Sequence, residues 1–240
     1  MTKIEVKAPL VAEKVKPGQF IVIRMHKKGE RVPLTFYKRD KKKGTVTIVF
    51  QKVGKSTHEL STYKVGEKLQ DVIGPMGTPT EIKKYGNVVC IGGGVGTPEV
   101  FPVANALKNA GNNVTIISGF RTKDLVICEN EMDKACTDEL YITTDDGTYG
   151  REGFTSDVLE ELIENKKIDL VHAVGPPIMM KVIADITKKH DIPTKASLNS
   201  IMLDATGMCG SCRVLVGGET KFACIDGPKF DAHEVDWSVL

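Results

Sequence analysis

The stretch NVVCIGGGVGTPEVFPVANALKNAG, Asn87 to Gly111, decides the fold. It reads as an apolar strand, a glycine-rich turn that contains Gly92, Gly93, Gly94 and Gly96, and then a helix. We expect Thr97 to cap this helix, with Pro98 at its first position. Glycine permits positive φ angles and close backbone approach, so amides at the helix start can face a pyrophosphate. The spacing differs from the G-x-G-x-x-G dinucleotide motif, and a merely tight strand-to-helix turn is the alternative.

The same alternation of strand, turn and helix continues to about Pro193. Two later loops follow strand-like runs: TDDGTYGREG (144–153), which contains Asp145, Asp146 and Gly147, and VGPP (174–177), which contains Gly175. Strands joined by amphipathic crossover helices predict a parallel sheet covered on both faces. Ligands of such sheets bind beyond the carboxyl ends of the strands, where all three loops are expected. We therefore predict an α/β nucleotide-binding domain over residues 86–193.

The N-terminal part has a different pattern. Between Lys3 and Tyr85, short β-rich runs such as QFIVIRM and TVTIVFQKVG alternate with turn residues such as Pro17-Gly18 and Gly74-Pro75. This pattern is typical of a small antiparallel barrel or sandwich. We predict such a β domain over residues 1–85.

The C-terminal segment, residues 194–240, carries three cysteines close together. Cys209 and Cys212 have C-x2-C spacing, and a hairpin turning at Gly217-Gly218 would return Cys224 beside Cys212. Together with Asp204 the spacing is D-x4-C-x2-C-x11-C, which matches the plant-type [2Fe-2S] pattern with Asp204 in place of the first cysteine. A segment this short has a weak hydrophobic core of its own, so a metal centre would help it fold. We predict a small [2Fe-2S] domain here.

Other identities fit the same residues less completely. A structural zinc site would normally present four cysteine or histidine ligands. A redox disulfide between Cys209 and Cys212 would leave Cys224 unexplained. Unrelated buried cysteines are a further alternative, and Asp204 can be a simple turn residue instead of a ligand.

Composition excludes several classes of protein. The chain has 240 residues, 41% hydrophobic and 27% charged, with a net charge of +2, as in ordinary globular proteins. The basic run KRDKKK (38–43) is interpreted as a solvated hairpin tip, and no nucleic-acid-binding footprint is evident. No apolar stretch approaches a membrane span and no signal-peptide layout is present, so we expect a cytoplasmic protein. Cys90, Cys128 and Cys136 are interpreted as structural thiols.

Six motifs together resemble one family over essentially the whole chain. They are ERVPLTFY, GPMGTP, GGGVGTPEVFP, TDDGTYGREGF, GPPIMMK and LDATGMCGSCRVLVGGETKFACIDGP, in that order. The chain is similar to the small, FAD- and [2Fe-2S]-containing subunits of electron-bifurcating NADH-dependent ferredoxin:NADP oxidoreductases, which are grouped with sulfide dehydrogenase and dihydroorotate dehydrogenase electron-transfer subunits. The resemblance implies a ferredoxin-reductase-like fold with an FAD-binding β-barrel, a nucleotide-binding domain and a small cluster domain.

The resemblance also implies which residues contact each cofactor. Arg31 would approach an FAD phosphate, while Pro33, Leu34 and Thr35 would run beside the isoalloxazine, with the Thr35 hydroxyl near flavin N5. The second FAD segment is Val53, Gly54, Lys55, Ser56 and Thr57, whose amides and hydroxyl would meet the pyrophosphate; an ordinary helix cap is the alternative. The NAD(H) site would include residues 92–97 with Asp145, Asp146 and Gly147. The cluster ligands would be Asp204, Cys209, Cys212 and Cys224, whereas the dihydroorotate dehydrogenase branch uses four cysteines.

The implied activity is electron transfer between NAD(H), FAD, a [2Fe-2S] cluster and a larger partner subunit in a heterodimer. That partner would carry a second FAD and [4Fe-4S] clusters, oxidise NADPH and reduce ferredoxin. Electron-transfer subunits of sulfide, hydrogenase or dihydroorotate dehydrogenase complexes are the alternative. A nucleotide-sensing module with structural zinc is the alternative from another class. The choice between NADH and NADPH stays open, because Arg121 and Lys123 can contact a 2′-phosphate or water.

Overall fold

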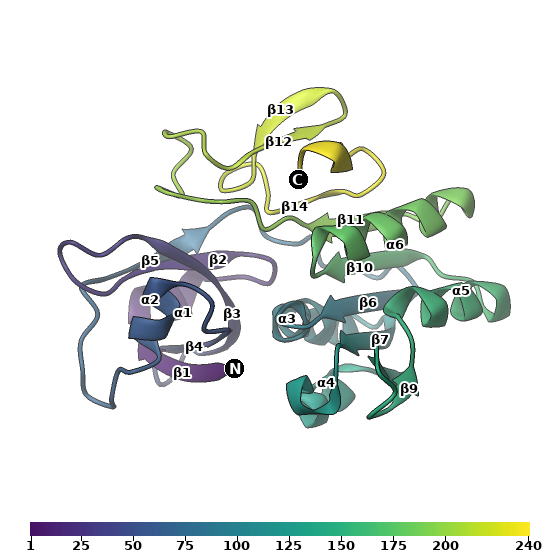
Figure 1. The fold of residues 1–240 in the computed structure, drawn as a ribbon, viewed down its shortest axis with the longest axis horizontal. Helices are drawn as coiled ribbons and strands as arrows, with labels where there is room; N and C mark the ends of the chain where they lie inside the picture. Colours follow the sequence, from purple (N-terminus) through teal and green to yellow (C-terminus); the bar gives the residue numbers. More distant parts are fainter. The chain divides into compact units, whose positions relative to one another are not determined.

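The computed structural model describes residues 1–240, which form two compact units (Figure 1). The first contains residues 1–80, 199–213 and 221–228, and the second contains residues 81–198, 214–220 and 229–240. The segment predicted as a separate cluster domain, 194–240, therefore contributes to both units. Its cysteine-bearing stretches belong with the N-terminal β strands.

The first unit is built on a five-stranded antiparallel sheet, as the sequence predicts. Its strands are β1 (Thr2–Lys7), β2 (Phe20–Arg24), β3 (Val32–Asp40), β4 (Thr45–Phe50) and β5 (Asp71–Met76), in the order β1-β4-β3-β2-β5. Two short helices, α1 (Pro9–Lys14) and α2 (Lys55–Leu60), lie between strands in the sequence. β-branched and aromatic residues dominate the strands, and these residue types fit a pleated, half-buried surface.

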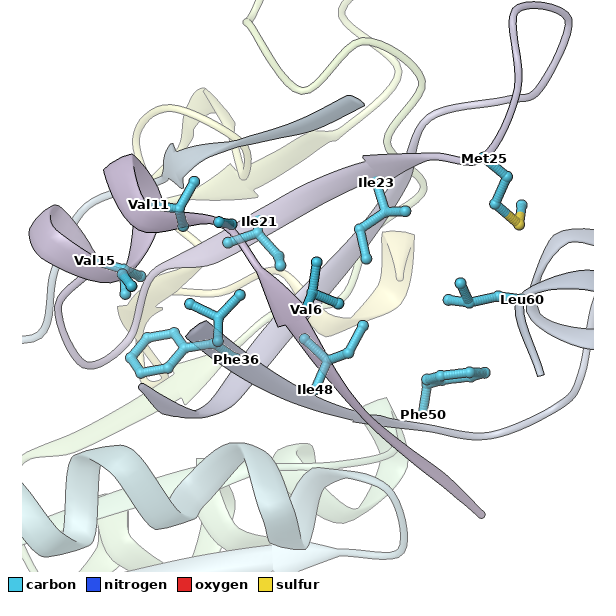
Figure 2. Close-up of a cluster of buried hydrophobic side chains, with 13 residues drawn as sticks. Val6, Val11, Val15, Ile21, Ile23, Met25, Phe36, Ile48, Phe50 and Leu60 are labelled. Atoms are coloured by element: carbon cyan, nitrogen blue, oxygen red, sulfur yellow. The ribbon is translucent and has the colours of Figure 1, made fainter. Parts of the chain in front are cut away.

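The core of this unit is one cluster of buried aliphatic and aromatic side chains (Figure 2). Ile21 and Ile23 of β2, Phe36 of β3 and Ile48 of β4 point into it, and Leu60 closes it from α2. Fully burying a side chain of this kind contributes about 1.5–3 kcal/mol. The cluster thus fixes the strands from which the predicted flavin segments extend.

The second unit is built on a seven-stranded sheet in the order β14-β11-β10-β6-β7-β8-β9. Its strands are β6 (Asn87–Gly93), β7 (Asn113–Phe120), β8 (Leu140–Thr144), β9 (Arg151–Glu152), β10 (Leu170–Val174), β11 (Thr194–Ser197) and β14 (Lys229–Asp231). All neighbouring pairs are parallel except β11 and β14. The helices are α3 (Gly96–Asn109), α4 (Glu129–Ala135), α5 (Thr155–Asn165) and α6 (Pro177–Lys189). The predicted parallel α/β architecture is confirmed.

The remaining strands, β12 (Arg213–Val216) and β13 (Glu219–Phe222), form a two-stranded sheet. Gly217 and Gly218 between them both have positive φ angles, 61° and 77°, as a tight two-residue hairpin turn requires. The predicted hairpin is therefore present. Short 3-10 turns at Lys123–Leu125 and Trp237–Val239 complete the secondary structure. None of the helices combines the length and hydrophobicity needed to cross a bilayer.

Candidate cofactor sites

The predicted nucleotide site lies at the carboxyl edge of the parallel sheet. The glycine turn follows β6, the Asp145–Gly147 stretch follows β8, and Gly175 follows β10. Strand β6 lies between β10 and β7. The strands β7 to β9 extend the sheet on one side of β6, and β10 and β11 extend it on the other, so the strand order reverses at β6. Open α/β sheets bind ligands at such switch points.

Most glycines of this edge are required by packing inside the protein. A Cβ atom on Gly93 would lie 2.5 Å from Met179 Sδ, and one on Gly96 would lie 2.2 Å from the Val174 carbonyl oxygen. A Cβ atom on Gly175 would lie 2.5 Å from Met179 Cε. Gly94 differs, because its φ is +54° and nothing lies within 4 Å of its Cβ position. Gly94 is therefore the glycine of this turn with open space beside it.

Thr97 does not cap helix α3 as the sequence predicts. The helix begins at Gly96, two residues earlier than expected, and has no side-chain cap. The Thr97 hydroxyl is instead buried without a hydrogen-bond partner, as are the hydroxyls of Ser118 and Thr143 on β7 and β8. Unpartnered buried hydroxyls are costly, and they concentrate below the edge where the nucleotide is expected.

The loop after β8 is ordered by its own polar groups. Asp146 Oδ1 accepts hydrogen bonds from the Thr148 hydroxyl at 2.7 Å and the Thr148 amide at 3.1 Å, which lower the pKa of this carboxyl. Lys123 Nζ lies 5.7 Å from the centroid of the Tyr149 ring, and the Tyr149 hydroxyl donates to the Glu129 carboxylate. Lys123 is thus placed against an aromatic ring, and both Lys123 and Arg121 are exposed.

The first predicted flavin segment lies at the start of β3. Pro33, Leu34 and Thr35 are half-buried and pair with Val22, Ile21 and Phe20 of β2. Arg31, just before the strand, is exposed. The core below β2 therefore fixes the backbone of this segment.

The second predicted flavin segment forms the start of α2. The Thr57 hydroxyl accepts from the amides of Val53 and Gly54, both at 3.1 Å, and donates to the Gly54 carbonyl at 3.0 Å. The Ser56 hydroxyl donates to the Glu30 carboxylate. Both hydroxyls therefore already have hydrogen-bond partners within the protein. The helix cap, which the sequence analysis gave as the alternative, is present. The exposed Lys55 leaves its side chain accessible to an anion.

Asp204 organises the loop that precedes Cys209. Its Oδ1 accepts from the Thr206 amide and its Oδ2 accepts from the Cys209 amide, each at 2.8 Å. These bonds, the Thr206 amide first, lower the pKa of the Asp204 carboxyl. Ala205 and Gly207 complete the turn with φ angles of 61° and 83°. The turn role of Asp204, one of the two alternatives from the sequence, is present in the structure.

Two of the three clustered cysteines come together. The Cys212 thiol donates to Cys224 Sγ at 3.2 Å, and both side chains are buried. Cys209 is exposed, and its thiol lies 3.2 Å from the Ser211 hydroxyl. No group of three or more histidine, cysteine, aspartate or glutamate side chains is close enough to hold one metal ion.

The cysteine pair is chemically suited to a metal. Burial, reinforced by Cys212, raises the pKa of the Cys224 thiol to about 12, so this thiol stays protonated at neutral pH in the absence of a positive charge. Metal ions are bound by thiolates and stabilise them. The hydrogen bond from the Ser211 hydroxyl lowers the pKa of the exposed Cys209 thiol. The cysteine loop therefore offers two buried sulfurs and one exposed, more acidic sulfur.

Comparison with known proteins identifies the cysteine segment. Residues 199–236 match the family described as the iron-sulfur cluster binding domain of dihydroorotate dehydrogenase B. The chain is 49% identical to the dihydroorotate dehydrogenase B (NAD(+)) electron transfer subunit homolog of Thermotoga maritima, over 97% of this chain and 82% of that protein. The chain belongs to the dihydroorotate dehydrogenase B electron-transfer-subunit family. The electron transfer subunit of Geobacillus thermodenitrificans is 35% identical over 94% of this chain and 89% of its own length.

Solved structures agree with this membership. A chain from the structure of NADH-dependent reduced ferredoxin-NADP oxidoreductase, described for flavin-based electron bifurcation, superposes with a TM-score of 0.94 at 46% identity. The match covers 99% of this chain and 86% of that chain. An Amycolatopsis cytochrome P450 reductase superposes with a TM-score of 0.65 at 20% identity, over 78% of this chain and 60% of its own. The ferredoxin-reductase-like fold predicted from the sequence is confirmed. The oxidoreductase electron-transfer role and the FAD, NAD(H) and iron-sulfur cofactors predicted from the sequence are confirmed.

Two features of these sites were not expected from the sequence. Met179 packs on Gly93 and Gly175, and Gly77-Thr78 of the GPMGTP motif contacts Gly227 beyond the cysteines. The Met179–Gly93 and Thr78–Gly227 contacts join residues far apart in the chain. In the sequence, only the glycines indicate these contacts, because glycine tolerates a close approach of other atoms to the backbone.

Proposed function

We propose that this chain passes electrons between NAD(H) and a larger partner subunit in a complex of the NADH-dependent reduced ferredoxin-NADP oxidoreductase type. The match to a chain of that enzyme, at 46% identity and a TM-score of 0.94, is the observation that carries this proposal. When bound, FAD supplies the exchange between hydride transfer from NADH and single-electron transfer to an iron-sulfur cluster. The protein residues bind and orient these groups.

In this proposal the FAD lies against the start of β3. Pro33 and Leu34 form a half-buried wall, and the Thr35 hydroxyl is assigned near flavin N5. Arg31 and Lys55, both exposed cations, are assigned to the FAD phosphates. Because the Thr57 and Ser56 hydroxyls and the Val53 and Gly54 amides already have protein partners, the proposal assigns the phosphate contacts to these two cations.

The cluster ligands in this proposal are Asp204, Cys209, Cys212 and Cys224. The sequence spacing and the cluster-domain match over 199–236 support them. The structure adds that Asp204 already lies against the Cys209 backbone through a 2.8 Å hydrogen bond. Replacing Asp204 by cysteine is expected to change the reduction potential of the cluster, because a carboxylate ligand is replaced by a thiolate. An unchanged potential would remove Asp204 from the ligand set.

The partner is proposed to cover the cysteine loop. Four large aliphatic side chains of this loop are exposed: Ile201 76%, Leu203 63%, Met208 89% and Ile225 44%. They flank the proposed ligands in sequence, with Met208 directly before Cys209 and Ile225 directly after Cys224. We call these four residues the aliphatic rim. Exposed apolar patches of this kind mark protein–protein contacts, and the names of the relatives describe them as electron transfer subunits.

A dihydroorotate dehydrogenase complex is the second candidate, because relatives of that name are 34–35% identical to this chain. The experiment that separates the candidates is anaerobic purification from the native cell with all accompanying proteins. Iron, flavin and partner content are then measured, followed by NADPH-dependent reduction of ferredoxin together with NAD, and by NADH-dependent reduction of orotate. The proposal expects a flavin- and iron-containing partner that acts on NADPH and ferredoxin. Material without iron or flavin, or a partner that acts on dihydroorotate, would contradict it.

A further inference from the structure

The end of strand β5 contacts the turn that carries Cys224. The Thr78 amide donates to the Gly227 carbonyl oxygen at 2.6 Å, and the Thr78 hydroxyl donates to the same oxygen at 3.0 Å. Both partners belong to the first compact unit, although they lie 149 positions apart in sequence. This contact, which we call the Gly77–Thr78 contact, joins the β strands of the unit to the cysteine loop.

Gly77 is enclosed on several sides. The Gln19 side-chain amide donates to its carbonyl oxygen at 2.7 Å. A Cβ atom on Gly77 would lie 2.9 Å from the Gly227 oxygen and from Pro228 Cδ, and 3.0 Å from a ring carbon of Phe20. Its φ of +73° also favours glycine. A side chain at this position would therefore have to displace either β2 or the 227–228 backbone.

On the cluster side, a closed turn transmits the position of Gly227 to Cys224. The amides of Ile225 and Asp226 both donate to the Phe222 carbonyl oxygen, at 3.0 and 2.8 Å. The Asp226 carboxylate in turn accepts from the Phe222 amide at 2.7 Å. Three hydrogen bonds thus fix the 222–226 backbone, so a shift of Gly227 moves the Cys224 sulfur.

On the flavin side, paired strands connect the Gly77–Thr78 contact with the β3 segment. Phe20 of β2 pairs with Met76 of β5 on one side and with Thr35 of β3 on the other. Met76 immediately precedes Gly77. A short path of paired strands therefore connects Thr35, assigned beside the flavin, with the backbone that holds Cys224.

We propose that Gly77 and Thr78 are positioning residues that set the separation between the flavin segment of β3 and the Cys224 end of the iron-sulfur cluster. They touch neither cofactor in this assignment; they hold the backbone of one site against that of the other. The inference rests on the proposed function, because it concerns electron transfer between the flavin and the cluster. Electron transfer between two cofactors slows as their separation grows, so a small displacement of one site from the other is measurable.

The test replaces Gly77 by alanine in the complete, cofactor-loaded protein. Gly66→Ala is the matched control, because Gly66 also has a positive φ, +96°, but has nothing within 4 Å of its Cβ position. Flavin reduction and cluster reduction by NADH are followed separately in single-turnover experiments, each in its own absorption band. Hydrogen exchange is measured at the amides of Thr78, Ile225 and Asp226, and flavin and iron contents are determined.

For Gly77→Ala we expect flavin reduction at the rate of the Gly66→Ala control and cluster reduction slowed several-fold. The Thr78 amide should exchange faster, while the Ile225 and Asp226 amides, which bond within their own turn, keep their protection. Thr78→Val, which retains the backbone bond and loses the hydroxyl bond, should slow cluster reduction less. Thr78→Ser should restore it.

If Gly77→Ala fails to fold, Thr78→Val and Thr78→Ser decide the matter by the same measurements. Cluster reduction in Gly77→Ala equal to that of Gly66→Ala, or in Thr78→Val equal to that of the unmodified protein, would overturn the inference. A failure of the proposed function gives a different result, since the unmodified protein would then lack flavin or iron, or its cluster would not be reduced by NADH.

Discussion

The Sγ atoms of Cys212 and Cys224 lie 3.2 Å apart, although 11 residues separate the two cysteines in sequence. The β12–β13 hairpin brings them together, and the Ala223 amide donates to the Cys212 carbonyl at 3.0 Å next to the pair. Both thiols are buried, and the proposed function assigns the pair as two of the cluster ligands.

We therefore expect Cys224→Ser to lose the cluster. Removing a first ligand should lower iron retention by more than the roughly 10- to 100-fold typical of losing an outer-shell partner. Iron content and the visible absorption of the purified protein check this. Cys128→Ser, at a cysteine outside the cluster loop, is the control and should retain iron. Full iron occupancy in Cys224→Ser would contradict the assignment.

The sequence was sufficient for features that depend on short-range patterns. Alternating strands and glycine turns predicted both sheets, and the adjacent Gly217 and Gly218 predicted the hairpin that pairs Cys212 with Cys224. The cysteine spacing identified the iron-sulfur segment that the family match confirms. These signals lie within a few residues of the structures they specify.

Features that depend on distant contacts were not predictable. The three-residue strand β14 pairs with β11 and so joins the C-terminal residues to the parallel sheet. Three residues are too few to show the alternation of apolar and polar residues that predicts a strand. Thr97 has the chemistry of a helix cap, yet the helix starts two residues earlier, at Gly96, where the Val174 carbonyl leaves no room for a side chain. Tertiary packing overrides local preference at these positions.

The glycine turn after β6 gives a second prediction. Gly94→Ala should weaken NADH binding by about tenfold, or about 1.4 kcal/mol, because a methyl group would project into the open space beside the turn. Gly111→Ala is the matched control: Gly111 also has a positive φ, +83°, with nothing within 4 Å of its Cβ position, but it follows α3 at the far end from the turn. Both variants should lose about 1–2 kcal/mol of stability from backbone strain.

Titration of flavin reduction with NADH and thermal unfolding of the loaded proteins measure these two effects. If Gly94→Ala bound NADH as tightly as Gly111→Ala, the turn would be a packing feature alone. This outcome would support the alternative given in the sequence analysis, that the segment is only a tight strand-to-helix turn.

The aliphatic rim gives a third prediction. The double variant Leu203→Ser and Met208→Ser should weaken the complex with the partner subunit by about 30-fold or more, since central apolar contacts contribute about 2 kcal/mol or more. Val65→Ser is the control, because Val65 is 108% exposed in the same unit but lies outside the cysteine loop. Iron and flavin contents should be unchanged in both. Partner affinity from titration calorimetry or co-elution checks the expectation, and equal affinity of the two variants would exclude the rim from the interface.

The buried histidine of the parallel sheet gives a prediction about pH. His172 lies on β10 between Cys90 of β6 and Lys195 of β11, and burial, assisted by the positive charge of Lys229, lowers its pKa from 6.5 to about 4. The folded protein therefore holds this imidazole neutral at pH values where the unfolded chain protonates it. Its contribution to stability is fully present above pH 6.5 and is lost as the pH falls from 6.5 towards 4, at up to about 1.4 kcal/mol per pH unit.

We expect His172→Gln to reduce the loss of unfolding free energy between pH 6.5 and pH 4 by about 3 kcal/mol, compared with the unmodified protein. His190→Gln, the same replacement at an exposed position after α6, is the control. Urea unfolding at several pH values measures both. Other acid-sensitive groups, such as the Asp138 carboxyl paired with Lys166, are common to all three proteins, so the difference between the curves isolates the imidazole. Parallel curves for the unmodified protein and His172→Gln would show that the imidazole is not held neutral by burial.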